Sequence, residues 1–360
     1  MPFLTLWAAE LEVSRDVGCG GENVRMADAG RFRARAQEIA DEVLFPAALA
    51  VDAADRVPAG QLDLLAAEGF YGVAAPPEAG GFGMDLPLAA ALLESLASGC
   101  LSTAFVWLQH HGPVMAAAHS DRPGIRATWL EPLAQGVRRA GIALAGLRSP
   151  TAPMRVRAVD GGYLLDGVVP WVTGWSMIDT LYTAARDEHD DVHFLFVDAV
   201  DAPTLATTPL ELVAVQASRT VDVRFDGHFV PADRLADVQA YGKWSSSDAS
   251  GSALNGFLAL GVVNRCCRLL GPSPLDAELA TTRAALLAAD ADAVPAARAA
   301  ASDLVLRATA QLAVQTGARA VLRDDHAQRL LREAAFLLVF GNRPAIRDAL
   351  LTRLRPGAPR

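Results

Sequence analysis

The chain has 360 residues, and 52% of them are apolar. A chain of this length can bury its own core and is expected to form two or three domains, at roughly 100–200 residues each. The net charge is −9 and no basic face or tail is present, so nucleic acid is not an expected partner.

The cysteines and the chain start further limit the class of protein. The four cysteines show no CxxC and no Cys/His ligand spacing, which predicts free thiols in a cytoplasmic protein and no metal site. The first residues, "MPFLTLWAAELEVSRD", lack a basic start and do not predict a secretory signal. No uncharged apolar run reaches about 18 residues, so no membrane span is expected.

The first third of the chain predicts helices. Residues 1–27 form an ambiguous extension, in which "VGCGGEN" is typical of a loop, and residues 28–140 predict an N-terminal helical domain. Apolar residues recur at helical spacing from residue 31, with Pro46 as an expected boundary. The later run "LPLAAALLESLASGC" is apolar on nearly all sides, which predicts a buried helix.

Residues 141–240 change in character and predict a middle β domain. Short β-branched or alternating runs such as "DVHFLFVDA" are separated by Gly, Asp and Pro. The stretch "DGGYLLDG" predicts a hairpin, with an Asp-Gly turn signal on each side. No GxGxxG or GxxxxGK[ST] loop lies between a strand and a helix, which argues against those two ways of binding phosphate.

Residues 241–360 return to helical patterns and predict a C-terminal bundle. The order of helices, strands and helices indicates a multidomain α+β protein with packed separate domains. One stretch, "REAAFLLVFGNRPAIRDALL", ends a helix at Phe340 before Gly341 and begins another at Pro344.

Several motifs, in the right order over roughly residues 28–354, resemble those of the acyl-CoA dehydrogenase family. The family's Gly-x-x-x-Pro-x-x-x-Gly-Gly-x-Gly loop is similar to "GVAAPPEAGGFG" here, and its Trp-Ile-Thr strand end resembles "WVT". The runs "SRTVDVRFD" and "VPAD" resemble the end of its β domain, and "AVQTGARAV" its Gln-and-glycine loop.

The resemblance implies a fold and a cofactor. It implies an N-terminal helical domain, a middle β-barrel-like domain and a C-terminal four-helix bundle, with FAD extended between the last two. It also implies a homodimer or homotetramer in which a neighbouring subunit contacts FAD. The cofactor positions that it implies here are Ser149, Trp171, Val172, Thr173, Gln315, Gly317 and Asn342.

Two departures from the family concern charge. The family's Arg-x-x-Phe-Gly element, whose Arg reaches an FAD phosphate, is replaced by "RLLGPSPLDAE". The usual catalytic base is the Glu of a Tyr-Glu-Gly turn, which aligns here with Val339, Phe340 and Gly341. A phenyl ring accepts no proton. Some members carry the Glu on the first helix of the bundle, near Gly251, which makes Asp248 a weak candidate base; its alternative role is a helix N-cap.

The substrate side of the site is predicted from the same comparison. The helix that carries His110 and His111 borders the ligand cavity in this family, so either histidine is a candidate acid or base, or a satisfied core residue. The resemblance implies a flavoprotein oxidoreductase acting on an acyl-CoA or acyl-carrier thioester. The alternatives are a flavin-dependent monooxygenase on the same scaffold and a catalytically silent paralogue acting as a binding or hetero-oligomer subunit.

Overall fold

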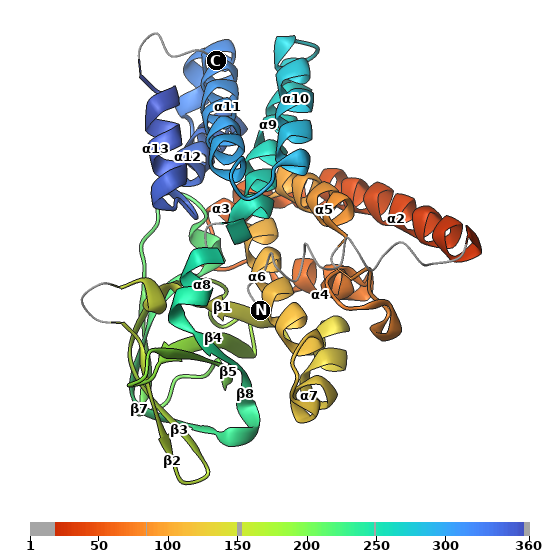
Figure 1. The fold of residues 1–360 in the computed structure, drawn as a ribbon. Coiled ribbons are helices and arrows are strands. Elements are labelled where there is room, and N and C mark those ends of the chain that lie inside the picture. Colours follow the sequence, from red (N-terminus) through yellow and green to blue (C-terminus); the bar gives the residue numbers. More distant parts are fainter. Residues whose placement is uncertain (1–18, 84, 150–152, 248–249, 356–360) are drawn as a thin grey trace.

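The computed structural model describes residues 19–83, 85–149, 153–247 and 250–355. It consists of an N-terminal helical domain, a central β-sheet domain and a C-terminal helical domain (Figure 1). The N-terminal helices are α2 (Cys19–Ile39), η2 (Ala40–Leu44), α3 (Phe45–Asp52), α4 (Ala59–Ala67), η3 (Phe70–Gly72), η4 (Pro77–Ala79), α5 (Leu86–Gly99), α6 (Leu101–Ala118) and α7 (Pro123–Ala134).

One local prediction for this region is wrong, and another is only partly confirmed. The segment "VGCGGEN" was expected to be a loop, but α2 begins inside it, at Cys19. Pro46 was expected to be a boundary, and it lies in the first turn of α3, directly after η2, although the chain stays helical from residue 19 to residue 52. The π-helical turn η2 carries an i→i−5 bond from the Phe45 N–H to the Ala40 carbonyl, and this wider turn accommodates the proline, which has no N–H to donate.

The central domain is a curved sheet of mainly antiparallel strands. Its strands follow the order β6-β7-β3-β2-β4-β5-β8, and β1 pairs with β4 in parallel. They are β1 (Ala140–Ala143), β2 (Arg155–Val159), β3 (Gly162–Val172), β4 (Thr180–Arg186), β5 (Asp191–Asp198), β6 (Leu205–Pro209), β7 (Val221–Pro231) and β8 (Leu235–Ala240), with short helices η5 (Ala145–Arg148), η6 (Gln216–Ser218) and η7 (Ala232–Arg234).

The predicted hairpin is present, but only one of its two Asp-Gly signals is a turn. Asp160 and Gly161 connect β2 to β3, with Val159 opposite Gly162 and Gly161 at φ 74°. The second pair lies within β3, where Gly167, at φ 127°, accompanies a register shift against β7. A glycine with positive φ inside a strand is typical of a bulge.

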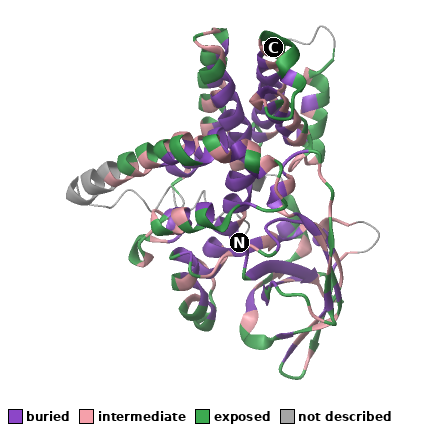
Figure 2. Cartoon of the chain, turned by 180° about the vertical axis from the view of Figure 1, so that it is seen from behind, coloured by how far each residue is buried: buried purple, intermediate pink, exposed green. Residues whose placement is uncertain are grey.

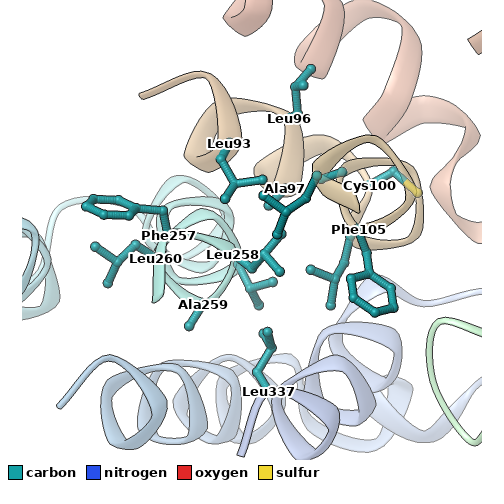
Figure 3. Packing of buried hydrophobic residues seen from close by; sticks show 14 of the residues in the cluster. Leu93, Leu96, Ala97, Cys100, Phe105, Phe257, Leu258, Ala259, Leu260 and Leu337 are labelled. Carbon is teal, nitrogen blue, oxygen red and sulfur yellow. The ribbon is translucent and has the colours of Figure 1, made fainter. Parts of the chain in front are cut away.

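The C-terminal domain packs directly on the N-terminal helices. Its helices are α8 (Tyr241–Ser247), η8 (Ser250–Asn255), α9 (Gly256–Leu270), α10 (Pro274–Ala288), α11 (Val294–Thr316), η9 (Gly317–Val321), α12 (His326–Val339) and α13 (Pro344–Arg353). One continuous apolar core joins α5 and α6 to α9 and α12, and Figure 3 shows Leu93 and Phe105 in it on the side of Leu258 and Leu337. The sheet encloses a separate core.

Burial follows this division of the fold. Figure 2 shows that α6 and the inner faces of α9 and α11 are buried, whereas α2 and the outer helices carry exposed faces. Among the described residues, the segment Ala253–Leu270 is the one helix apolar and long enough to cross a membrane, but 67% of it is buried inside the protein. It is a core helix of this fold.

Candidate functional site

The turn between α12 and α13 holds Phe340 in an aromatic cluster. The Phe340 ring stacks on Phe336, with ring centroids 5.3 Å apart, and meets Phe105 of α6 edge-on at 4.8 Å. Phe105 also contacts Phe336 at 5.2 Å. We call these three rings the phenylalanine cluster; Phe340 is the member that was predicted to stand in place of the family's catalytic Glu. The contact of Phe105 with Phe340 was not predicted, because the two residues are 235 positions apart in the sequence.

Side chains of α11 fix the end of α12 that carries Phe340. Arg298 donates from Nη2 to the Phe340 carbonyl at 3.1 Å, and Ser302, one turn later, donates to the Leu337 carbonyl at 3.1 Å. Arg298 is only 3% exposed. Burial and the nearby charge of Arg343 lower the pKa of Arg298 to about 10, so the guanidinium remains charged at neutral pH. A cation here suits the partial negative charge of a helix C-terminus.

The predicted cofactor residue Asn342 lies in the same turn. Its Nδ2 donates to the Leu338 carbonyl at 3.1 Å. Its Oδ1 is buried and has no hydrogen-bond partner among the described residues. A buried amide oxygen without a donor has a free-energy cost, which a ligand N–H or a water at this position would remove.

The end of β3 presents an exposed indole beside a buried hydroxyl network. Trp171 is 59% exposed and has φ 61°, a left-handed conformation that is uncommon for a residue with a side chain. The backbone N–H of Trp171 donates to the Asp222 carboxylate at 3.2 Å. Val172 is fully buried, and Thr173 pairs its hydroxyl with that of Thr220 at 3.1 Å. Strained backbone of this kind is often kept where a ligand binds.

The other predicted cofactor residues lie at the end of η5 and at the end of α11. Ser149 is half-buried at the end of η5. Gln315 and Gly317 are exposed at the far end of α11. Because Arg298 lies near the start of α11, Gln315 is about five turns, or about 25 Å, away from the Phe340 turn.

His110 is a buried structural residue. Its Nε2 lies 2.9 Å from the Leu133 carbonyl and its Nδ1 accepts from the Ala140 N–H at 3.1 Å, which fixes the neutral Nε2–H tautomer. Burial lowers the pKa of His110 to about 3. Its ring also meets Tyr71 edge-on at 4.6 Å. Both ring nitrogens are therefore occupied, and this geometry gives no support to the predicted acid or base role.

His111 is buried on another face of α6. Its ring meets Trp107 at 4.2 Å, and neither ring nitrogen has a hydrogen-bond partner in the described part of the chain. Burial holds the pKa of His111 well below its usual range. His110 and His111 follow Phe105 by five and six residues, or about 140° and 240° around the helix. It is Phe105, and not the histidines, that the structure brings against Phe340.

The remaining site predictions concern Asp248 and metals. Asp248 lies outside the described residues, so its role stays a prediction. Within the described ranges, no group of three or more His, Cys, Asp or Glu side chains could hold a metal ion. Two cavities, of about 160 and 290 Å³, lie between α5 and α10 and beside β5 and β7, and no predicted site residue lines either of them.

The sequence and the fold are both similar to known proteins. Residues 27–137 match the N-terminal domain of acyl-CoA dehydrogenases. The chain is 25% identical over 216 residues to the mitochondrial short-chain specific acyl-CoA dehydrogenase of Bos taurus, covering 57% of this chain and 52% of that protein. It is 28% identical over 237 residues to benzylmalonyl-CoA dehydrogenase of Aromatoleum aromaticum, covering 62% and 61%. The matches thus span about half to three fifths of these relatives.

Solved structures share the fold at low sequence identity. Butyryl-CoA dehydrogenase from Megasphaera elsdenii superposes with a TM-score of 0.78 at 15% identity, covering 90% of this chain and 96% of that one. A glutaryl-coenzyme A dehydrogenase complex with glutaryl-CoA gives 0.79 at 15%, covering 92% and 97%. PigA, solved with FAD and proline, gives 0.77 at 16%, covering 91% and 97%. With the match of residues 27–137, these similarities show that the chain has the fold of acyl-CoA dehydrogenases and is distantly similar to them in sequence.

Proposed function

We propose that the protein is an acyl-CoA dehydrogenase-like flavoprotein oxidoreductase that oxidises a CH–CH bond of an acyl thioester. The observation that carries this proposal is the end of β3, where the exposed, strained Trp171 stands beside the buried Thr173 hydroxyl. These residues lie at the family's flavin-contacting positions. An indole can cover a flat ring system, and a hydroxyl can hydrogen-bond a ring heteroatom.

The groups present fit part of an FAD molecule. Trp171 and Thr173 would hold the ring, and the buried Oδ1 of Asn342 could accept a hydrogen bond from the cofactor. The family's phosphate-contacting Arg element has no counterpart in the sequence. In the corresponding segment, α10 begins at Pro274 with a Ser273–Asp276 capping box. When bound, FAD would supply the acceptor for the hydride that leaves the substrate.

The oligomeric state belongs to the same proposal. In the family comparison, Gln315 and Gly317 contact cofactor, yet here they lie about 25 Å from the Phe340 turn of their own chain. This distance supports a homodimer or homotetramer in which each chain supplies that loop to its neighbour. A monomer by light scattering at micromolar concentration would contradict it. A cytoplasmic location is proposed with it.

A base other than residue 340 has to remove the substrate proton, because a phenyl ring accepts none. Asp248 is the proposed base. Asp248→Asn is expected to abolish reduction of bound flavin by the substrate while leaving flavin content unchanged, because an amide keeps the shape but does not take up a proton. Unchanged bleaching in this variant would reject Asp248.

A flavin-dependent monooxygenase is the second candidate. The phenylalanine cluster favours it, because three apolar rings at the position of the acid suit a reaction that needs no carboxylate there. The missing Arg element instead favours a catalytically silent subunit, whose partner supplies the missing groups.

A visible spectrum of the purified protein separates these candidates first. Yellow protein, or uptake of added FAD, is expected, followed by bleaching when acyl-CoA thioesters are mixed in without oxygen. A colourless protein that takes up no FAD would rule out both the dehydrogenase and the monooxygenase function for the isolated chain. Bound flavin that never bleaches, together with oxygen-dependent turnover of externally reduced flavin, would support hydroxylation instead.

A further inference from the structure

Two segments of the β domain, residues 171–176 and residues 215–220, carry most of the strained backbone. Among the described residues, five other than glycine have a positive φ, and four of these lie here: Trp171 (61°), Ser176 (65°), Val215 (52°) and Arg219 (48°). A β-branched residue such as Val215 rarely adopts this conformation. Strain of this kind persists only where the surrounding structure holds the residue, and it is often found where a ligand binds.

Hydrogen bonds hold the two segments together. The backbone N–H of Gly174 donates to the Ser218 carbonyl at 2.9 Å. Among the side chains, the hydroxyl oxygen of Thr220 lies 3.1 Å from that of Thr173 and 2.8 Å from that of Ser218. All three side chains are buried. They form a line, which we call the hydroxyl chain, with Thr220 in the middle and Ser218 and Thr173 at its ends.

The hydroxyl chain has one proton more than it has links. Each hydroxyl can donate one hydrogen bond, so three protons serve two links. Ser218 is fully buried, and within the described part of the protein its hydroxyl and that of Thr220 have no partner outside the chain. A buried hydroxyl proton without an acceptor has a free-energy cost. The arrangement that avoids this cost has Ser218 donating to Thr220 and Thr220 donating to Thr173, which leaves the Thr173 proton for a ligand.

We propose that Ser218 and Thr220 are positioning residues that make Thr173 a hydrogen-bond donor to the flavin ring beside Trp171. The inference rests on the proposed function for the identity of the ligand. The ring atom that meets Thr173 is then an acceptor, either a carbonyl oxygen or a nitrogen without a proton. A hydroxyl that accepts one hydrogen bond donates a stronger one, so the hydroxyl chain increases the affinity of Thr173 for such an atom.

The affinity of the full chain for FAD, measured by fluorescence titration, tests this role. Thr220→Val keeps the shape of the side chain and removes its hydroxyl, and it is expected to weaken FAD binding about three- to tenfold. In a chain that already carries Thr173→Val, the same substitution is expected to have no further effect, because Thr220 acts only through the Thr173 hydroxyl. An equal loss of affinity in both backgrounds would show that Thr220 acts by packing and would overturn the proposal.

Conservative and control variants separate the hydroxyl from the fold. Thr220→Ser keeps the hydroxyl and is expected to retain the wild-type affinity. Thr183→Val removes another buried hydroxyl of the same sheet, which donates to the Ala143 carbonyl at 2.9 Å, and it should leave FAD binding unchanged. If Thr220→Val does not fold, Thr220→Ser and Thr220→Ala make the same comparison, since they differ only by a hydroxyl. Equal affinities in these two variants would overturn the proposal.

This inference and the proposed function fail in different ways. A wild-type chain that takes up no FAD would overturn the proposed function and remove the ligand of the hydroxyl chain with it. FAD bound equally by wild type, Thr220→Val and Thr173→Val would overturn the role of the hydroxyl chain alone.

Discussion

Phe340 is the residue at which we predict that the catalytic chemistry of this chain departs from that of its relatives. We predict that Phe340→Glu, added to the Asp248→Asn variant that lacks the proposed base, makes flavin reduction by an acyl thioester at least about 100-fold faster, because general-base catalysis contributes about 10²–10⁴-fold. Phe336→Glu is the matched control, since it places the same charge in the same cluster one turn away. Rapid mixing with FAD-loaded protein measures the rate. Equal rates in both variants would show that residue 340 does not face the substrate.

The histidine pair on α6 gives a second prediction at this scale. His110→Leu is expected to lower the free energy of unfolding by about 2–4 kcal/mol, because the Leu133 carbonyl and the Ala140 N–H lose their partners. His111→Leu is expected to raise it by about 1 kcal/mol, because it removes a buried imidazole with no hydrogen bonds. Urea unfolding at pH 7 measures both. A loss of stability in His111→Leu as large as that in His110→Leu would contradict the assignment.

The same pair sets a pH dependence. The pKa of His110 is about 3 in the folded chain, against 6.5 ordinarily, so below pH 6.5 the unfolded chain binds a proton that the folded chain does not. The stability that the neutral His110 contributes is therefore fully present above pH 6.5. It is lost as the pH falls toward 3, by about 1.4 kcal/mol of unfolding free energy per pH unit for a buried histidine. His110→Leu or His111→Leu should each reduce the pH dependence of the unfolding free energy between pH 4.5 and 6.5. An unchanged pH dependence would refute the assignment of these histidines as buried and neutral.

The sequence identified some residues of the candidate site but not their partners. Phe340 and Trp171 were predicted because each lies in a short motif that resembles one of the family's motifs, in the same order along the chain. Phe105, Arg298 and Asn255 carry no such motif, and they meet the Phe340 turn only through packing of distant helices. Single-sequence periodicity places a residue on a helix face but does not say which helix packs there.

At the scale of elements, the contact between η2 and α5 depends on one glycine. A Cβ on Gly99 would lie 2.7 Å from Leu44 Cβ and 2.8 Å from the Ala40 carbonyl. Gly99→Ala is therefore expected to destabilise the protein by about 1–3 kcal/mol through overpacking. Gly30, in α2, has open space around it, so Gly30→Ala should be neutral or stabilising by up to about 1 kcal/mol. Thermal unfolding compares them, and equal effects would refute this packing.

The same contact explains why the boundary at Pro46 does not interrupt the helical run. A proline in a helical pattern predicts a boundary, because local rules count only the lost hydrogen bond and the steric clash. Here the π-helical turn absorbs both, and the close approach at Gly99 holds that turn against α5. The strand order of the sheet was also beyond prediction, since β3 pairs with β7 across some 50 residues of chain, whereas the hairpin turn at Asp160-Gly161 is local and was found.

At the scale of the whole molecule, the two helical domains share one apolar core and are expected to unfold together. The domain order was predictable from the change of periodicity along the chain, but this shared core was not. Asp41 of η2 ties the domains: its carboxylate accepts from Arg265 Nη2 at 2.6 Å and from Arg268 Nη2 at 2.8 Å, both on α9. Arg265 is almost completely buried and also donates to the Ser98 carbonyl at 2.7 Å.

Removing this carboxylate should therefore destabilise both domains at once. Asp41→Asn is expected to cost about 2–4 kcal/mol, because it leaves the buried Arg265 charge without its counter-ion. Burial alone raises the pKa of Asp41, but hydrogen bonds from Arg268, Gln37 and Arg265 outweigh it and lower the pKa to about 2. The stability that the Asp41 carboxylate contributes is thus present above pH 3.8, the ordinary pKa of an aspartate, and is lost as the pH falls toward 2. Asp41→Asn should not show this loss.

Hydrogen exchange can distinguish this shared unfolding from a local effect. In Asp41→Asn, the amides of α5 and α9 should lose protection together, because one core spans both helices, while β3 and β7 keep theirs within the separate core of the sheet. Asp55→Asn is the control, since Asp55 pairs with Arg56 and Arg219 at the exposed surface and should change little. Faster exchange confined to η2 would show that the helical domains are joined by contact alone and do not unfold as one unit.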